Sequence, residues 1–231
     1  MNALDDYDWF FVHIPKNAGT AFRQLFCRTQ KSSHKPCSTI TENECRRTMC
    51  IVRNPFDRLV SAFLYMRMPR NLYHDNTKEN PTKHPCHDLA RRCTFAQFVH
   101  LLVRGKVPPS PHLQPQTDFL WSPAGAIHTR MLRLECLDAD MAQFFVCRDI
   151  GTRLDRVNSS RDAGDDWRKY YTPELMDLVR KIYAVDFVHL PYTSTGEPSA
   201  AHHVFPHHMQ STASGLVTLP PASRIRKTFS L

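Results

Sequence analysis

The hydrophobic pattern begins with a short apolar run that ends abruptly at a proline. Residues 9–14 are aromatic and β-branched, and Pro15 removes a backbone donor, so we predict a buried strand that stops there. Apolar residues then recur at helical spacing behind Thr20, a residue suited to N-cap a helix. A strand that feeds a helix N-terminus through a tight turn gathers unpaired N–H groups. We therefore expect an anion site in this turn, with phosphate as its usual ligand.

The residues of this turn support that expectation. Gly19 permits a close approach of the backbone, and Lys16 adds a mobile positive charge. The stretch is not a Walker A motif, because the lysine precedes the glycine by three residues and no hydroxyl follows the lysine to bind magnesium. The alternative is a buried strand with an ordinary turn.

A second strand, turn and helix follow at residues 49–65. Pro55 suits the first turn of the predicted helix, whose apolar residues repeat with a period of 3.6. Arg53 lies at the end of the strand, and Ser61 lies about two turns into the helix. A guanidinium and a hydroxyl that converge there are suited to clamp a second phosphate.

The rest of the apolar pattern completes an α/β fold. It predicts a helix at 94–104 capped by Thr94, a strand at 131–135, a helix at 141–147 capped by Asp138 or Asp140, and a helix opened by Thr172 and Pro173. We expect a P-loop-like three-layer sandwich, in which a short central parallel sheet is flanked by helices and ligands bind at the carboxyl ends of the strands.

Composition limits the domain count and the partners. The 231 residues suffice for one domain, placed at 1–192, and the Ser-, Thr-, Pro- and His-rich remainder at 193–231 is predicted to be disordered or loosely packed. The formal net charge of +8 favours polyanionic partners. Eight cysteines include no CxxC pair, which argues against a zinc ribbon, while Cys27 with Cys37 and Cys86 with Cys93 remain possible disulfides.

Two stretches resemble a known family. HIPKNAGTAF at 13–22 and VRNPFDRLVSAF at 52–63 resemble the 5′-phosphosulfate and 3′-phosphate motifs of sulfotransferases that use 3′-phosphoadenosine 5′-phosphosulfate (PAPS), with the carbohydrate sulfotransferase branch the most similar. The resemblance implies that Lys16 contacts the bridging oxygen and sulfonate as a catalytic residue. It also implies that Arg53 and Ser61 hold the 3′-phosphate, and that the 5′-phosphate is held by Asn17, Ala18, Gly19, Thr20 and Ala21.

The same resemblance supplies candidates for the general base. HLQPQ at 112–116 is similar to an HFRPQ-type signature of this branch, which makes His112 the preferred base; the alternative is a histidine that orients Gln116 or its loop. His34 is the second catalytic candidate, because some members of the family place a histidine between the two phosphate motifs. A solvated surface histidine is the alternative there.

The C-terminal part of the resemblance adds further positions. The stretch from 157 to 175 resembles an NSS…YYTPEL region whose loop closes over the nucleotide, so Asn158, Ser159 and Arg161 are cofactor-binding candidates. The predicted strand 131–135 resembles a family strand that ends in Arg-x-Glu, so Arg133 and Glu135 either border the pocket or form a structural ion pair.

The resemblance implies sulfuryl transfer from PAPS to an acceptor hydroxyl of a carbohydrate, with release of 3′,5′-adenosine bisphosphate, and the net charge favours an anionic glycan. No metal is expected, and nucleic acid is not the expected partner. No apolar run reaches 18 residues, so the chain is expected to be soluble as given, or to belong in the Golgi lumen if an N-terminal anchor is missing. Two alternatives remain: a basic nucleotide- or glycan-binding module without turnover, and a divergent P-loop nucleotide kinase.

Overall fold

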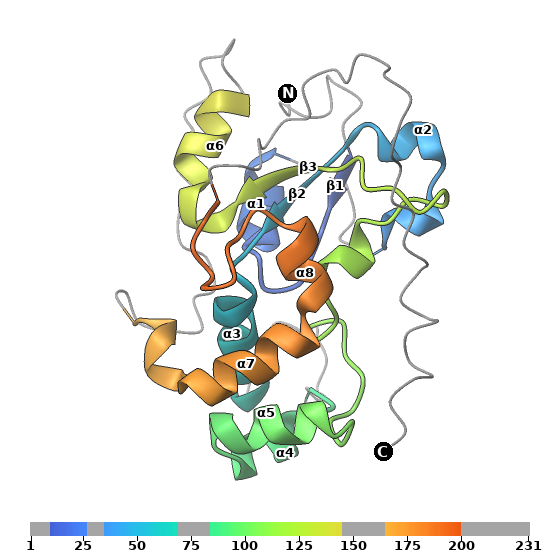
Figure 1. Cartoon of the computed structure of the whole chain (residues 1–231). Helices are drawn as coiled ribbons and strands as arrows, with labels where there is room; N and C mark the ends of the chain where they lie inside the picture. The colour runs from blue at the N-terminus through green and yellow to red at the C-terminus, as the bar shows by residue number, and fades with distance from the viewer. Residues whose placement is uncertain (1–9, 27–34, 69–83, 145–164, 200–231) are drawn as a thin grey trace.

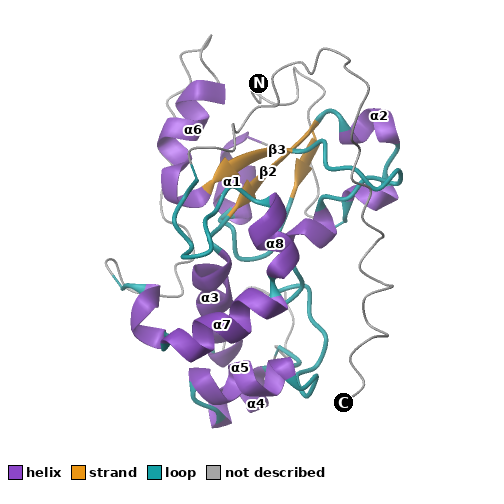
Figure 2. Cartoon of the chain, viewed as in Figure 1, coloured by secondary structure: helices purple, strands orange, loops and turns teal. Residues whose placement is uncertain are grey.

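The fold is built on one short parallel sheet. The computed structural model describes residues 10–26, 35–68, 84–144 and 165–199. Within them the sheet has the order β1-β2-β3, formed by Phe10–Val12, Thr48–Val52 and Arg130–Arg133. Figures 1 and 2 show the three strands side by side with helices packed around them. The predicted α/β architecture is confirmed.

Helices make up most of the remaining described structure. The α-helices are α1 Gly19–Phe26, α2 Glu42–Cys45, α3 Pro55–Arg67, α4 His87–Arg92, α5 Phe95–Val103, α6 Leu137–Phe144, α7 Pro173–Ile182 and α8 Ala184–His189. Four 3₁₀ turns join them: η2 Cys37–Thr39, η3 Gln116–Phe119, η4 Leu134–Cys136 and η5 Trp167–Tyr170.

Alternation along the strands buries both faces of the sheet. Val12, Cys50 and Val52 pack with Leu120, Leu190 and Tyr192 in one cluster. On the neighbouring position of β1, the ring of Phe11 stacks on Phe22 of α1, with 4.6 Å between ring centroids. All five residues of β2 are buried. A parallel sheet covered on both sides explains why its central strand, β2, is a nearly continuous apolar run.

A second apolar cluster lies in the helical half of the molecule. It joins α3, α4, α5, α7 and η5, which lie together below the sheet in Figure 1. Phe56 is central, because its ring stacks on Trp167 at 5.4 Å and meets the edge of Tyr171 at 5.3 Å. This cluster fixes α3, the helix that follows the second predicted phosphate motif.

Helix caps follow the sequence signals in most places. Thr94 and Gln97 form a capping box on α5, and the Thr172 hydroxyl accepts from the N–H of Leu175 ahead of α7. Asn54 caps α3, with Pro55 as its first residue.

Two predicted caps are wrong. Helix α1 already begins at Gly19, so Thr20 is its second residue and not its cap. Helix α6 begins at Leu137, which places Asp138 and Asp140 inside its first turn. The Asp140 carboxylate instead binds Arg133, as described below.

The described chain continues in a packed turn beyond residue 192. Tyr192 and Pro198 form an antiparallel bridge, and the Thr193 N–H donates to the Glu197 carbonyl at 2.8 Å. At Gly196, where φ is +86°, a Cβ would lie 2.6 Å from the side-chain nitrogen of Asn54. This turn therefore packs against the N-terminus of α3. Residues 200–231 of the predicted tail lie outside the described part.

The cysteines of the described segments are free thiols. Cys50 is fully buried in β2, and Cys86 and Cys93 are not bonded to each other. Cys37 is also free. Cys27, its predicted partner, lies outside the described residues.

Candidate active site

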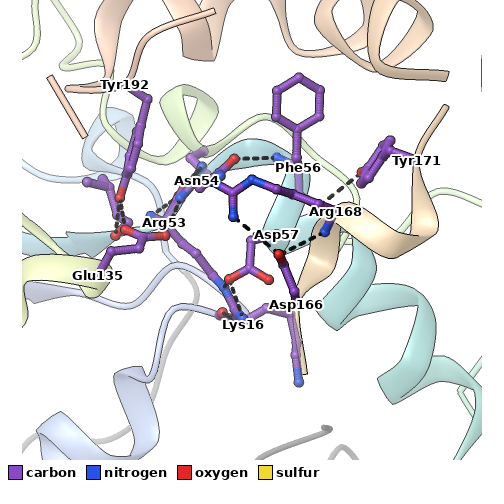
Figure 3. Close-up of polar contacts among 12 residues, drawn as sticks. Lys16, Arg53, Asn54, Phe56, Asp57, Glu135, Asp166, Arg168, Tyr171 and Tyr192 are labelled. Atoms are coloured by element: carbon purple, nitrogen blue, oxygen red, sulfur yellow. Dashed lines mark hydrogen bonds and ion pairs between the residues drawn. The ribbon is translucent and has the colours of Figure 1, made fainter. Parts of the chain in front are cut away.

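The two predicted phosphate motifs meet at the carboxyl ends of adjacent strands. β1 leads into the turn that carries Lys16, and β2 leads directly to Arg53. The Arg53 Nη1 donates a hydrogen bond to the backbone carbonyl of Lys16 at 2.9 Å, although the two residues are 37 positions apart. Figure 3 shows this contact beside the Asp57 carboxylate. The structure therefore brings both motifs into one site.

The turn after β1 has an unusual backbone. Lys16 and Ala18 adopt positive φ angles of 72° and 57°, which residues with a Cβ rarely occupy. The Ala18 carbonyl accepts the first helical hydrogen bond, from the N–H of Phe22. The N–H groups of Gly19, Thr20 and Ala21 precede that bond and have no partner within α1. An anion at the start of this eight-residue helix would find those donors and the positive end of the helix dipole.

Lys16 lies in an unusual electrostatic environment. Its Nζ lies 4.0 Å from the centre of the Tyr65 ring. Burial, and then the positive charges of Arg53 and Arg58, lower the pKa of the Lys16 amine to about 7. A bound anion would oppose this shift by favouring the charged ammonium. The lysine is therefore poised to gain a proton when negative charge enters the site.

Arg53 is oriented by the first turn of α3, the helix that follows it. Its Nε donates to the Asp57 carboxylate at 2.8 Å, and its Nη2 lies 2.8 Å from the same oxygen. With the bond to the Lys16 carbonyl, three of the five guanidinium N–H groups are engaged by described residues. The side chain remains 13% exposed. A fixed, partly exposed guanidinium is suited to a phosphate.

A single glutamine ties the two motifs together. The side-chain oxygen of Gln116 accepts from the Asn17 amide at 2.7 Å and from the N–H of Arg53 at 3.0 Å. Its side-chain nitrogen donates to the Arg53 carbonyl at 2.7 Å. Asn17 also donates to the Ile51 carbonyl at 2.8 Å. The first turn, the second turn and η3 are thereby joined by one buried amide.

The backbone of η3 is held by a buried carboxylate. Asp186, which is fully buried, accepts from the N–H groups of Gln116 and Thr117 at 2.9 and 3.0 Å and from the Thr117 hydroxyl at 2.9 Å. Burial raises the pKa of Asp186, while these hydrogen bonds oppose the shift. The carboxylate thus fixes the start of η3, from which Gln116 reaches the site.

Arg58 clamps the first turn to the loop that carries His112. Its guanidinium donates to the carbonyls of Pro15, Gln114 and Pro111 at 3.0, 2.7 and 3.3 Å. The side chain is only 2% exposed, and burial lowers its pKa. An arginine with three backbone carbonyls as partners has a structural role beside the site.

Ser61 and Tyr65 lie one turn apart on α3. Ser61 is 3% exposed and lies on α3, the helix that begins two residues after Arg53. Tyr65 contributes the ring on which the Lys16 amine lies. The assignment of Ser61 to a 3′-phosphate stays a prediction.

His112 is part of a buried cluster. Its Nδ1 lies 3.2 Å from the Ser110 hydroxyl, and its ring stacks on Tyr65 with centroids 5.1 Å apart. The structure thus places the predicted base beside the same ring as Lys16. Its role as a base stays a prediction.

Glu135 and Arg133 do not pair with each other. Arg133 binds both oxygens of Asp140, at 2.6 Å for the shorter contact. Glu135 accepts from the N–H of Asn54 at 2.9 Å and from the Tyr192 hydroxyl at 2.6 Å. Burial raises the pKa of Glu135. Glu135 thus borders the second turn, whereas Arg133 binds the helix that follows it.

Several predicted site residues cannot be placed. His34, Asn158, Ser159 and Arg161 lie outside the described residues. Within the described segments, no group of three or more His, Cys, Asp and Glu side chains could hold a metal ion. The helices described here also include none long and apolar enough to span a membrane.

Comparison with known proteins agrees with this geometry. A sequence model of the sulfotransferase family matches residues 1–193. The chain belongs to the sulfotransferase family. That family transfers sulfuryl groups, and the described fold, a parallel sheet flanked by helices, is consistent with it. No curated protein and no solved structure gave a significant match.

Sequence reasoning missed several residues that build this site. The sequence gives no role to Arg58, Tyr65 or Asp186, and it suggests Gln116 only as a possible partner of His112. A charged residue within an apolar helix face was the available signal for Arg58, since such residues are seldom buried without partners. The partners themselves lie 43 to 56 positions away, beyond any local pattern.

Proposed function

We propose that this sulfotransferase uses PAPS as its donor and a carbohydrate hydroxyl as its acceptor. The observation that carries the proposal is the hydrogen bond between the Arg53 guanidinium and the Lys16 carbonyl. It joins a turn suited to a 5′-phosphosulfate to a cation suited to a 3′-phosphate. A donor with phosphates at both ends of one nucleotide would engage both motifs at once.

The residues present fit such a donor. The N–H groups at the start of α1 would hold the 5′-phosphate, and the N–H groups of Arg53 not engaged by described residues would hold the 3′-phosphate, with Ser61 as a further donor. Lys16 is the only lysine of this turn, and its amine would lie near the bridging oxygen. The chemistry of the donor set is therefore that of a polyanion site.

The reaction follows from these roles. The acceptor oxygen forms a bond to sulfur while the bond between sulfur and the bridging oxygen breaks, and that electron pair stays on the phosphate. Protonated Lys16 and the α1 N–H groups would stabilise the charge that builds there, while a base removes the acceptor proton. The products are a sulfated acceptor and 3′,5′-adenosine bisphosphate.

The acceptor proposal rests on charge and on the resemblance of the two motifs to the carbohydrate branch. The formal net charge of +8 favours an anionic acceptor, and an acidic glycan carries both hydroxyls and negative charge.

Calorimetry with two nucleotides tests the donor site. We expect the protein to bind 3′,5′-adenosine bisphosphate more tightly than 5′-AMP, and Arg53→Ala to remove that preference. One charge-assisted hydrogen bond contributes about 1.5–3 kcal/mol, which corresponds to roughly 10- to 150-fold in affinity. Arg91→Ala is the matched control, because Arg91 is exposed on α4 and lies outside the two motifs and outside the 157–175 stretch.

The outcomes separate the candidate functions. A bisphosphate preference that depends on Arg53 supports the PAPS site, and radiolabelled transfer to a panel of glycans then identifies the acceptor. Equal, weak binding of both nucleotides would favour a basic binding module without turnover. Tight binding that requires magnesium and ignores the 3′-phosphate would favour a nucleotide kinase.

A further inference from the structure

Two histidines from separate loops converge on one serine beside the candidate site. His84 precedes α4, and Ser110 and His112 precede η3. The Ser110 hydroxyl lies 3.3 Å from His84 Nε2 and 3.2 Å from His112 Nδ1. All three residues are at most 5% exposed. The two imidazoles also meet edge to face, with centroids 5.1 Å apart.

The backbone fixes the proton of His84. The N–H of Cys86 donates to His84 Nδ1 at 3.0 Å. Because that nitrogen accepts, a neutral His84 carries its proton on Nε2. The Nε2–H therefore donates to the Ser110 hydroxyl oxygen.

The hydrogen bonds of Ser110 in turn determine which ring nitrogen of a neutral His112 carries the proton. Its oxygen accepts from His84 and, at 3.3 Å, from the backbone N–H of His112. A hydroxyl oxygen has two lone pairs, and both are then used. The hydroxyl proton is left to donate to His112 Nδ1, so a neutral His112 carries its own proton on Nε2.

The network lies next to the reactive lysine. The His112 ring stacks on Tyr65 with an interplanar angle of 25°, and the Lys16 amine lies 4.0 Å from the centre of the same ring. One aromatic ring therefore contacts both the lysine and the histidine. The orientation set by His84 and Ser110 thus concerns a histidine that shares the Tyr65 ring with Lys16.

We propose that His84 is a positioning residue that, through Ser110, holds His112 in its Nε2–H tautomer, so that His112 donates a hydrogen bond to a substrate oxygen instead of acting as the base. The proposal rests on the proposed sulfuryl-transfer function of this site. It concerns a hydrogen bond, and no proton is transferred at His112.

Nitrogen NMR of the imidazoles tests the tautomer in the full chain. Proton–nitrogen correlation spectra distinguish Nδ1–H, Nε2–H and doubly protonated rings. At pH 7.5 we expect His112 to show the neutral Nε2–H pattern, and Ser110→Ala to lose it. A wild-type His112 protonated on Nδ1 would overturn the proposal.

Two substitutions of His84 sharpen the test. Asparagine at residue 84 can place its side-chain oxygen where Nδ1 accepts from Cys86, but it is too short to reach Ser110. Glutamine can place its amide N–H near the position of Nε2, from which it can donate to Ser110. We expect His84→Gln to preserve the His112 pattern and His84→Asn to lose it. His87→Asn is the matched control, because His87 is equally buried and its Nδ1 contacts the Met66 carbonyl instead of Ser110. Equal changes in the His84 and His87 variants would show a general structural effect and reject the positioning role.

Activity gives a second readout that does not require the acceptor. Release of sulfate from PAPS should fall about tenfold in His84→Asn and stay within about twofold in His84→Gln, as expected for one hydrogen bond. Affinity for 3′,5′-adenosine bisphosphate should be retained in both variants. A confirmed tautomer with unchanged sulfate release in His84→Asn would reject the role in transfer. Failure of the wild type to bind the bisphosphate would instead reject the proposed function, whatever the tautomer.

Discussion

The imidazole of His13 occupies the space that a side chain at Gly19 would need. A Cβ on Gly19 would lie 2.2 Å from Cδ2 and 2.5 Å from Nε2 of that ring. His13 follows β1 directly and is 8% exposed, so it has little room to move. The absence of a side chain at residue 19 thus lets α1 begin directly against the end of the strand, where its N–H groups are predicted to bind an anion.

We expect Gly19→Ala to destabilise the fold and weaken bisphosphate binding. Overpacking of this kind costs about 1–3 kcal/mol, which denaturant unfolding would measure. The double variant Gly19→Ala, His13→Ala should recover part of that loss, since the colliding ring is gone. Gly125→Ala is the control, because its Cβ would meet nothing within 4 Å and only its positive φ is strained. Additive losses in the double variant would contradict the steric explanation.

The lowered pKa of Lys16 predicts proton uptake when the donor site fills. With a pKa of about 7, the amine is largely neutral at pH 8 in the free protein, and a bound polyanion should restore its charge. Affinity for 3′,5′-adenosine bisphosphate should therefore fall as pH rises above 7. Calorimetry in buffers of different ionisation enthalpy should show net uptake at pH 8, and Lys16→Met should abolish it. Unchanged uptake in Lys16→Met would assign the proton to another group.

The lowered pKa of Lys16 also makes the free energy of unfolding depend on pH, in a defined direction. The unfolded chain, in which the amine keeps its ordinary pKa of 10.5, binds more protons than the folded chain between about pH 7 and 10.5. The contribution of Lys16 to the free energy of unfolding should thus rise with pH across that window.

For catalysis, we expect Lys16→Met to lower the transfer rate about 10²- to 10³-fold. Lys106→Met, on an exposed residue, is the matched control for both measurements.

Gln116→Ala should weaken the connection between the turn after β1 and the turn after β2. It removes one of the two hydrogen bonds of the buried Asn17 side-chain amide and the Gln116 partner of both backbone groups of Arg53, and each such loss costs about 1–3 kcal/mol. We expect a marked drop in the unfolding midpoint and in bisphosphate affinity. Gln114→Ala, on an exposed side chain two residues away, should change neither. Normal binding by a stable Gln116→Ala variant would show that the bridge is dispensable.

Arg58→Met should destabilise the fold by about 3–5 kcal/mol, because three backbone carbonyls lose charge-assisted hydrogen bonds. Arg58→Lys should recover only part of this energy, since a single ammonium cannot match the planar fork. Denaturant unfolding measures both, with Arg91→Met on the exposed face of α4 as the control. A loss below about 1 kcal/mol would mean that the carbonyls find other partners.

Local signals account for the elements that the sequence predicted correctly. Thr94 and Thr172 cap their helices because a hydroxyl and the N–H three residues later are set by the chain itself. The prediction that Thr20 caps the first helix is wrong, because the local backbone conformation there is not the usual one for these residue types. Ala18 adopts a left-handed conformation, which a sequence does not reveal for a residue with a Cβ, and the helix then starts at Gly19.

The sequence by itself determined the two motifs that are predicted to bind phosphate, the parallel α/β arrangement and the positions of Lys16 and Arg53 at the strand ends. These depend on hydrophobic periodicity and on residues close together in the chain. Only the tertiary structure decided that Gln116 joins the two turns, that Arg58 clamps the His112 loop, and that His84 reaches Ser110. Those contacts span 26 to 99 positions. The partners in these contacts are buried polar groups, which need hydrogen bonds. The groups that supply those bonds are neighbours only in the folded chain, so no local sequence pattern predicts them.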